Sequence, residues 1–146
     1  MAQDAITLLD ADHQRVEALF KDYQSAGADK QQKFDLAQII CMELTVHAQL
    51  EEELFYPAVR QATGDQQMVQ EAEQEHQEAK QLIAKIQGQQ DTDALVQQLQ
   101  KAIEHHVQEE RQEMFAKARQ AGLDLAQLGR QIEARKAELV SSMQAA

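Results

Sequence analysis

Six residues of metal-ligating type stand where the helical pattern of the chain calls for apolar core residues: His13, His47, Glu51, His76, His106 and Glu110. Unpaired carboxylates in an apolar interior are very costly, and four imidazoles beside them need further polar partners. A bound metal centre compensates all of these groups at once. A structural zinc site is closed by four ligands, whereas six ligands fit a pair of irons with open coordination positions.

The segments around the second and fourth of these histidines repeat each other. His47 and Glu51 are four residues apart, as are His106 and Glu110, and an aromatic residue stands nine positions after each histidine. Side chains four apart lie on one face of a helix, with about 5–6 Å between their Cβ atoms. The repeat therefore predicts two helices that each contribute a histidine and a glutamate to one metal or a metal pair.

Apolar residues recur at helical spacing along the whole chain, which predicts an all-α protein. The predicted helices cover about residues 4–23, 30–62, 66–87, 93–120 and 124–143, with a loop over 88–93, and Pro57 is expected to kink the last turns of the second helix. Four long helices with short connections favour an up-down-up-down four-helix bundle. We expect this bundle in residues 1–120, and in residues 121–146 an additional C-terminal amphipathic helix packed on the bundle or extending it.

Composition narrows the range of partners and compartments. The formal net charge of −11 argues against a nucleic-acid partner and against docking on an anionic membrane, and it attracts metal cations. The single cysteine, Cys41, excludes an internal disulfide and is expected to be a small buried hydrophobe. No apolar run has transmembrane length and the N-terminus does not read as a signal peptide, so we expect a cytoplasmic protein.

The chain resembles the hemerythrin-like HHE cation-binding family over about Leu8 to Lys117. The resemblance is carried by His13 in Asp-His-Gln-Arg-Val, by His47 and Glu51 running into Phe-Tyr-Pro, by His76 in Glu-His-Gln-Glu, and by His106 with Glu110. It implies that these six residues ligate two iron ions, Fe²⁺ or Fe³⁺, with an oxo or hydroxo bridge. It also implies that the two glutamates bridge or cap the metals.

Two positions depart from the oxygen-carrying hemerythrins, which resemble a five-histidine version of the pattern. Lys80 stands where those proteins have a second histidine on the third helix, and Arg111 where they have an aspartate. The resemblance therefore points to the branch associated with sensing or handling oxygen, nitric oxide, peroxide or iron. We favour binding or sensing of O2, NO or peroxide and assign no catalytic residue.

Two alternatives stay open. One is a di-iron enzyme that decomposes peroxide or oxidises iron, and the other is an iron-sensing protein whose C-terminal helix docks on a partner or on a second copy. Other residues receive simpler interpretations. His105 is expected to flank the ligand His106, and the stretch 71–78 apart from His76 to form a solvated helix face. Tyr56 is expected in the core or at the rim, with a hydrogen bond to bound oxygen as the alternative. Glu52 is expected on a solvated face, with the orientation of a ligand histidine as the alternative.

Overall fold

The computed structural model describes residues 3–87, 89 and 91–145, and every regular element in this part of the chain is helical. Gly88 and Gln90 of the predicted loop lie outside the described residues, as do residues 1, 2 and 146 at the ends of the two predicted domains. The elements are α1 (Ala5–Ser25), α2 (Lys30–Leu50), η1 (Glu51–Phe55), α3 (Tyr56–Thr63), α4 (Gln66–Ile86), α5 (Asp93–Glu109), η2 (Glu110–Met114), α6 (Phe115–Gln120) and α7 (Leu125–Ala145).

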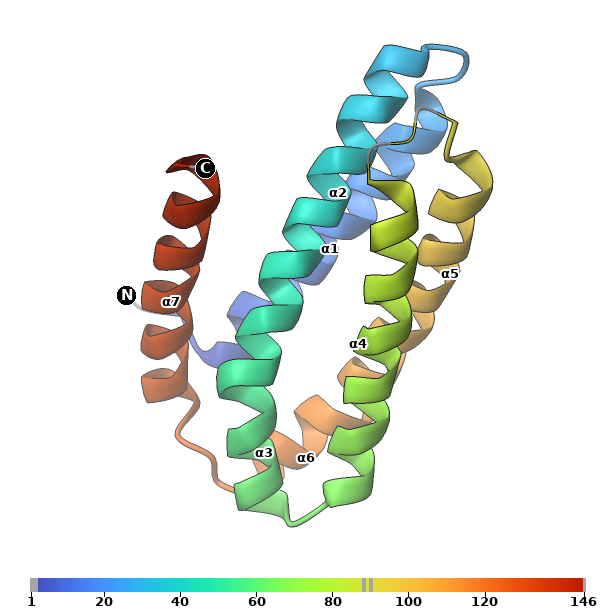
Figure 1. The fold of residues 1–146 in the computed structure, drawn as a ribbon. Helices are drawn as coiled ribbons and strands as arrows, with labels where there is room; N and C mark the ends of the chain where they lie inside the picture. Colours follow the sequence, from blue (N-terminus) through green and yellow to red (C-terminus); the bar gives the residue numbers. More distant parts are fainter. Residues whose placement is uncertain (1–2, 88, 90, 146) are drawn as a thin grey trace.

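The helices form an up-down-up-down bundle with an additional C-terminal helix, so the predicted fold class is confirmed (Figure 1). Helices α2, η1 and α3 form one continuous rod, and α5, η2 and α6 form another. Helix α1 packs on α2, α4 packs on α5, and α7 runs back along α1 and α2. Neighbouring rods are antiparallel, so residues near the middle of each rod meet at one level.

Short polar residues fix where the rods begin. Asp4, Asp29 and Asp65 precede α1, α2 and α4, and each side chain accepts a hydrogen bond from the backbone N–H three residues later. Such caps satisfy donors that have no partner within the helix. Gly64 ends α3 at φ +70°, a left-handed conformation that glycine adopts without strain. These signals set the register in which each histidine faces inward.

A polar layer divides the apolar core into two clusters. One cluster contains Leu9 and Leu50 and the other contains Val16 and Leu44, so His13 and His47 lie between the two along their own helices. The same order holds on α4, where His76 lies between Ala72 and Ala79. Packed side chains above and below the layer hold its polar groups in place and away from water.

Both long rods change winding at a predicted ligand. The π-helical turns η1 and η2 begin at Glu51 and Glu110, and the N–H groups of Tyr56 and Phe115 bond to carbonyls five residues back. Pro57, which was expected to kink this helix, lies two residues after η1. Proline does not cause the π-turn, because η2 has the same turn and is followed at the same distance by Ala116. Single π-turns are frequent at functional sites.

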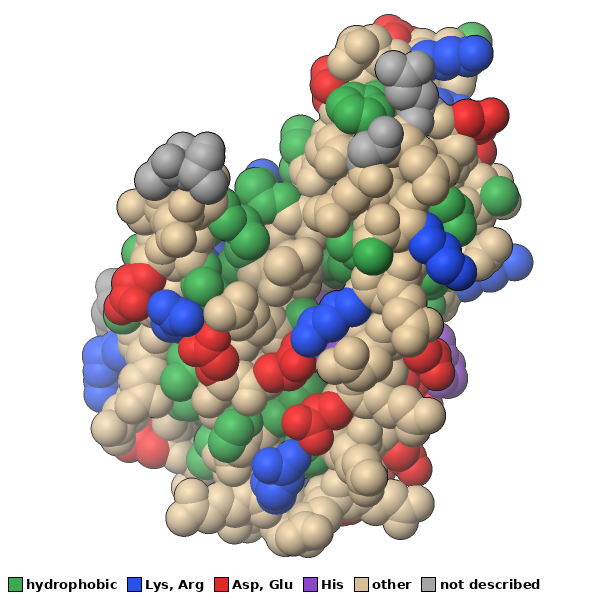
Figure 2. Space-filling view, viewed as in Figure 1, with side chains coloured by type: hydrophobic (Ala, Val, Ile, Leu, Met, Phe, Trp, Pro, Cys, Tyr) green, Lys and Arg blue, Asp and Glu red, His purple; other side chains and the backbone are tan. Residues whose placement is uncertain are grey.

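The surface carries mixed charge on the face seen in Figure 2, where Lys and Arg side chains mostly lie beside Asp or Glu. Ion pairs such as Arg60–Glu73 and Arg135–Glu53 account for this mixing. Across residues 3–87, 89 and 91–145, no helix is long and apolar enough to cross a membrane.

Candidate metal centre

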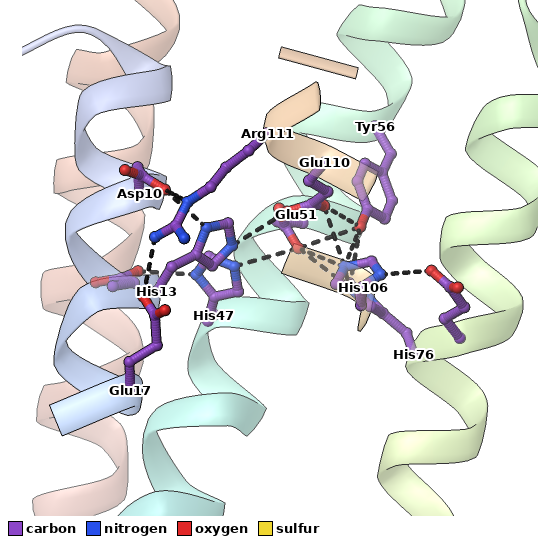
Figure 3. A network of polar contacts seen from close by, with 12 residues as sticks. Asp10, His13, Glu17, His47, Glu51, Tyr56, His76, His106, Glu110 and Arg111 are labelled. Carbon is purple, nitrogen blue, oxygen red and sulfur yellow. Dashed lines mark hydrogen bonds and ion pairs between the residues drawn. The ribbon is translucent and has the colours of Figure 1, made fainter. Parts of the chain in front are cut away.

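The six predicted ligands meet in the polar layer (Figure 3). Their residues are between 0 and 6% exposed, so the centre is closed to bulk water. They form two sets whose ligand atoms lie within 4.8 Å of one another. The first set, here called the first position, contains His13 and His47, and the second position contains His76 and His106. Glu51 and Glu110 belong to both sets, which is the arrangement expected for two metal ions bridged by carboxylates.

Distances within the layer are similar at the two positions. The ring centroids of His13 and His47 are 4.8 Å apart, as are those of His76 and His106. Glu110 Oε1 lies 3.1 Å from His13 Nε2, while Glu110 Oε2 lies 3.2 Å from His106 Nε2. Glu51 Oε1 lies 3.3 Å from His47 Nε2 and 3.1 Å from His76 Nε2. Each carboxylate thus links both halves of the centre.

Buried ligand atoms at the first position lack aligned hydrogen bonds. These atoms are His13 Nε2, His47 Nε2, Glu51 Oε2 and Glu110 Oε1. A buried polar group without a partner costs about 1–3 kcal/mol, so four of them in one place need an explanation. Two of them, His13 Nε2 and Glu110 Oε1, are 3.1 Å apart, and imidazole with carboxylate is a donor set that suits iron, zinc and manganese. The residues present therefore fit a metal ion.

A second ring of carboxylates orients the histidines. The Nδ1 atom of each histidine lies 2.7–3.2 Å from a carboxylate oxygen, in the pairs His13–Asp10, His47–Asp12, His76–Glu52 and His106–Glu75. A histidine that donates from Nδ1 presents the lone pair of Nε2 for coordination. With Nδ1 held by a carboxylate, all four Nε2 atoms point into the centre and can coordinate a metal ion once they carry no proton.

Each of these carboxylates has a further basic partner. The pairs are Asp10–Arg111 at 2.6 Å, Asp12–Lys136 at 2.6 Å, Glu52–Lys80 at 2.9 Å and Glu75–His105 at 3.4 Å. Lys80 and Arg111, the two positions that depart from the oxygen carriers, thus act on the carboxylates and do not point into the centre. The side chain of His105 is 66% exposed, so its predicted place beside the ligand His106 is confirmed.

Tyr56 places a hydroxyl group at the second position. The hydroxyl donates to Glu110 Oε2 at 2.6 Å and lies 3.0 and 3.2 Å from the Nε2 atoms of His76 and His106. Tyr56 was expected in the core or at its rim. It is fully buried, but its oxygen belongs to the centre. One signal for this role was present in the sequence, since an aromatic residue stands nine positions after each of the two repeated histidines. The other such residue, Phe115, stacks on His13 with 5.9 Å between the ring centroids.

Sequence reasoning anticipated the ring of orienting carboxylates only in part. For Glu52 an orienting role was left open beside a solvated face, and its bond to His76 supports that role. Glu75 was placed on a solvated face only, and its bond to His106 corrects this. A signal was present, since Asp12, Glu52 and Glu75 each stand next to a predicted ligand along the chain. Each serves the histidine of a neighbouring rod, because adjacent residues of a helix point about 100° apart.

Electrostatics raise the pKa of His47, His76 and His106 and lower that of Glu51 and Glu110 in the metal-free protein. Burial alone lowers the pKa of His47, but the charge of Glu51 and the hydrogen bond to Asp12 raise it to about 10. Burial raises the pKa of Glu51, but the neighbouring histidines, above all His47, bring it well below its ordinary value. Burial and the charge of Glu110 raise the pKa of Tyr56 well above its ordinary value, so the hydroxyl keeps its proton. A metal ion takes the place of the imidazole protons.

A small apolar cavity borders the centre. Its volume is about 30 Å³, and all four histidines contribute to its wall. The rest of the wall is mostly apolar and includes Val16, Leu44, Ala79, Ile83, Ile103 and Val107. Since one water needs about 10–15 Å³ measured in this way, the cavity admits a molecule of about two heavy atoms. A larger organic substrate does not fit.

Fold and centre together define a helical-bundle protein built to bind metal ions. The model of the hemerythrin HHE cation binding domain family matches residues 4–118, and the chain belongs to this family. No curated protein and no solved structure gives a significant match. Helix α7 lies beyond the matched residues.

Proposed function

We propose that the protein binds two iron ions without haem and binds or senses O2, NO or peroxide at them. The carrying observation is the convergence of four Nε2 atoms on two shared, buried carboxylates, each histidine held through Nδ1 by a carboxylate. Two iron ions, when bound, supply open coordination positions and reversible one-electron chemistry. The ligands proposed are His13, His47, Glu51, His76, His106 and Glu110.

The cavity supports a small neutral ligand. Leu44, Ile83 and Ile103 line it on the side away from the carboxylates and leave few partners for water. An apolar cavity of this size disfavours ions and organic molecules and admits a diatomic gas. The same side chains exclude bulk water from the histidines, which limits unwanted reactions of a bound oxidant.

A peroxide-decomposing or iron-oxidising activity is the second candidate, and Tyr56 favours it. Its hydroxyl keeps its proton and donates a hydrogen bond to Glu110 Oε2 at 2.6 Å, so it is also placed to donate a hydrogen bond to an oxygen atom of a bound peroxide. Chemistry that cleaves an O–O bond is assisted by a hydrogen-bond donor of this kind. Binding alone does not require it.

Metal content and the optical spectrum of aerobically purified protein test the proposal. We expect two irons per chain and near-ultraviolet absorption that bleaches on anaerobic reduction. Spectral changes when O2, NO or peroxide is added to the reduced protein identify the ligand, and rapid oxygen release from peroxide selects the enzyme. A folded protein that takes up one metal ion or none overturns the proposal.

Adjacent histidines supply a matched control for this experiment. His106→Ala removes a buried ligand of the second position, whereas His105→Ala removes an exposed side chain one residue earlier. His105→Ala removes a further partner of Glu75, so we expect it to weaken binding slightly and keep its iron, whereas His106→Ala loses iron. Equal iron content in the two variants contradicts the assignment of His106 as a ligand.

A further inference from the structure

Helix α7 reaches the metal centre through one side chain. Lys136 Nζ donates to Asp12 Oδ1 at 2.6 Å, and Asp12 Oδ2 accepts from His47 Nδ1 at 3.0 Å. Asp12 is 8% exposed, so its charge is largely shielded from water. A segment outside the matched family domain is therefore two hydrogen bonds away from a proposed ligand.

The other three orienting carboxylates take their basic partners from the bundle itself. Arg111 lies in η2, Lys80 in α4 and His105 in α5, which all carry or adjoin ligands. Lys136 differs because α7 follows the bundle and is joined to α6 through residues 121–124. His47 is thus the histidine whose orientation depends on the docking of an added helix.

Docking of α7 depends on close backbone contact at Gly129. A Cβ atom at this position would collide with the carbonyl oxygen of Gln3 and lie 3.0 Å from the carbonyl carbon of Asp4. Leu128 and Ile132, one and three residues from Gly129, are buried, and so is Leu139 further along α7. Glycine therefore allows α7 to approach the start of α1 and brings Lys136 within reach of Asp12.

We propose that Lys136 is a positioning residue that couples the docking of α7 to metal affinity at the first position. The inference rests on the proposed metal binding. Without its cation, Asp12 is a largely buried carboxylate whose remaining partner, His47, is neutral once a metal ion is bound, so Asp12 turns toward water and releases the ring of His47. Coupling of this kind is reciprocal, so metal binding tightens the docking of α7 by the same factor.

Anaerobic titration of the metal-free full chain with Co²⁺ tests the coupling. Lys136→Met is expected to weaken one of the two binding steps about tenfold, the lower end of the effect of removing a direct partner of a ligand. Lys136→Arg restores the step because it keeps the charge. Arg135→Gln is the matched control, because it removes the neighbouring ion pair between α7 and the bundle, Arg135–Glu53. Glu53 keeps its hydrogen bond from Gln49 in this variant.

Gly129→Ala gives an independent route to the same result. Alanine favours helix by about 0.5–1 kcal/mol over glycine, so a weaker first position in this variant comes from lost docking and not from a weaker helix. In the wild type, we expect hydrogen exchange of α7 amides to slow when Co²⁺ is bound. In Lys136→Met we expect no such slowing.

The outcomes separate the two proposals. Failure of the wild type to bind metal overturns the proposed function. If the wild type binds two Co²⁺ ions and Lys136→Met behaves as Arg135→Gln does in both titration and exchange, the coupling is overturned and the proposed function stands. Where chemical denaturation shows that both metal-free variants are folded under the titration conditions, a difference in affinity between them is not a loss of fold.

Discussion

The two positions of the centre have the same types of ligand but differ in the aromatic side chain beside them, because only Tyr56 carries a hydroxyl group. At each position two imidazoles 4.8 Å apart face the same two glutamates. The repeat places an aromatic residue nine positions after a ligand histidine in both long rods, and each ring lies against the histidines of the opposite position. Tyr56 brings a hydroxyl to His76 and His106, while Phe115 stacks on His13 without a polar atom.

This difference gives the two positions of one site different hydrogen-bonding partners. At the first position the buried ligand atoms lack aligned hydrogen bonds, and the aromatic side chain beside them, Phe115, has no hydroxyl group. At the second position the Tyr56 hydroxyl donates a hydrogen bond to Glu110. Similar ligand sets therefore do not imply similar reactivity, because the side chain beside the ligands determines which groups can donate to a bound molecule.

Removing a shared carboxylate is expected to have the largest effect, since it damages both halves together. Glu51→Gln keeps the shape of the side chain but removes the negative charge that faces His47 and His76. We expect more than about 100-fold weaker binding of both metal ions, beyond the 10–100-fold effect of losing an outer partner. Metal titration of the variant provides the measurement. Retention of one tight site would show that Glu51 does not bridge.

Removing one histidine tests whether the halves are separable. His13→Ala and His76→Ala each delete a ligand from one position and leave both glutamates in place. We expect the metal content to fall from two ions to one per chain in both variants, as measured by elemental analysis of the purified protein. Loss of both ions in either variant would mean that the two positions fill only as a unit.

Much of this centre follows from sequence, and the missing part has a physical cause. His13, His47 and His76 interrupt apolar stripes, and helical periodicity alone places such residues inward. The orienting carboxylates do not interrupt a stripe. Asp12 faces sideways toward His47, and this contact depends on how α1 packs against α2, which single-helix periodicity does not contain. The role of Lys136 is still harder to predict from sequence, because its position depends on the close approach of α7 at Gly129.

The π-turns are a second feature that the sequence pattern does not reveal. A five-residue winding shifts the register of all later residues by one position relative to an α-helix. Tyr56 and Phe115 come directly after these turns, so their inward direction depends on them. The fold class was predictable because it depends on apolar periodicity and caps, whereas the direction of the Tyr56 side chain depends on one irregular backbone hydrogen bond.

Competition between protons and metal ions is expected to give the next largest effect. With its pKa raised to about 10, His47 carries a proton at pH 7 that must leave when a metal ion binds. Apparent affinity at the first position therefore rises as pH increases from 7 toward 10, by up to about tenfold per pH unit for one displaced proton. Calorimetric titrations in buffers of different ionisation enthalpy measure the number of protons released. No release at the first step would show that His47 is already neutral.

Replacing Tyr56 by phenylalanine, or Phe115 by tyrosine, is expected to have the smallest effect and tests the difference between the two positions directly. Tyr56→Phe removes the bond to Glu110, and the carboxylate left without it is expected to lower the unfolding free energy of the metal-free protein by about 1–3 kcal/mol. With Co²⁺ bound, the visible spectrum should change at the second position alone. Phe115→Tyr should change the first position alone, because its ring lies on His13. Tyr23→Phe, which loses a bond to Asp93 in the other core cluster, is the control for a buried hydroxyl and should leave both spectra unchanged. Equal spectral changes at both positions in Tyr56→Phe would contradict the asymmetry, since one hydroxyl would then serve the centre as a whole.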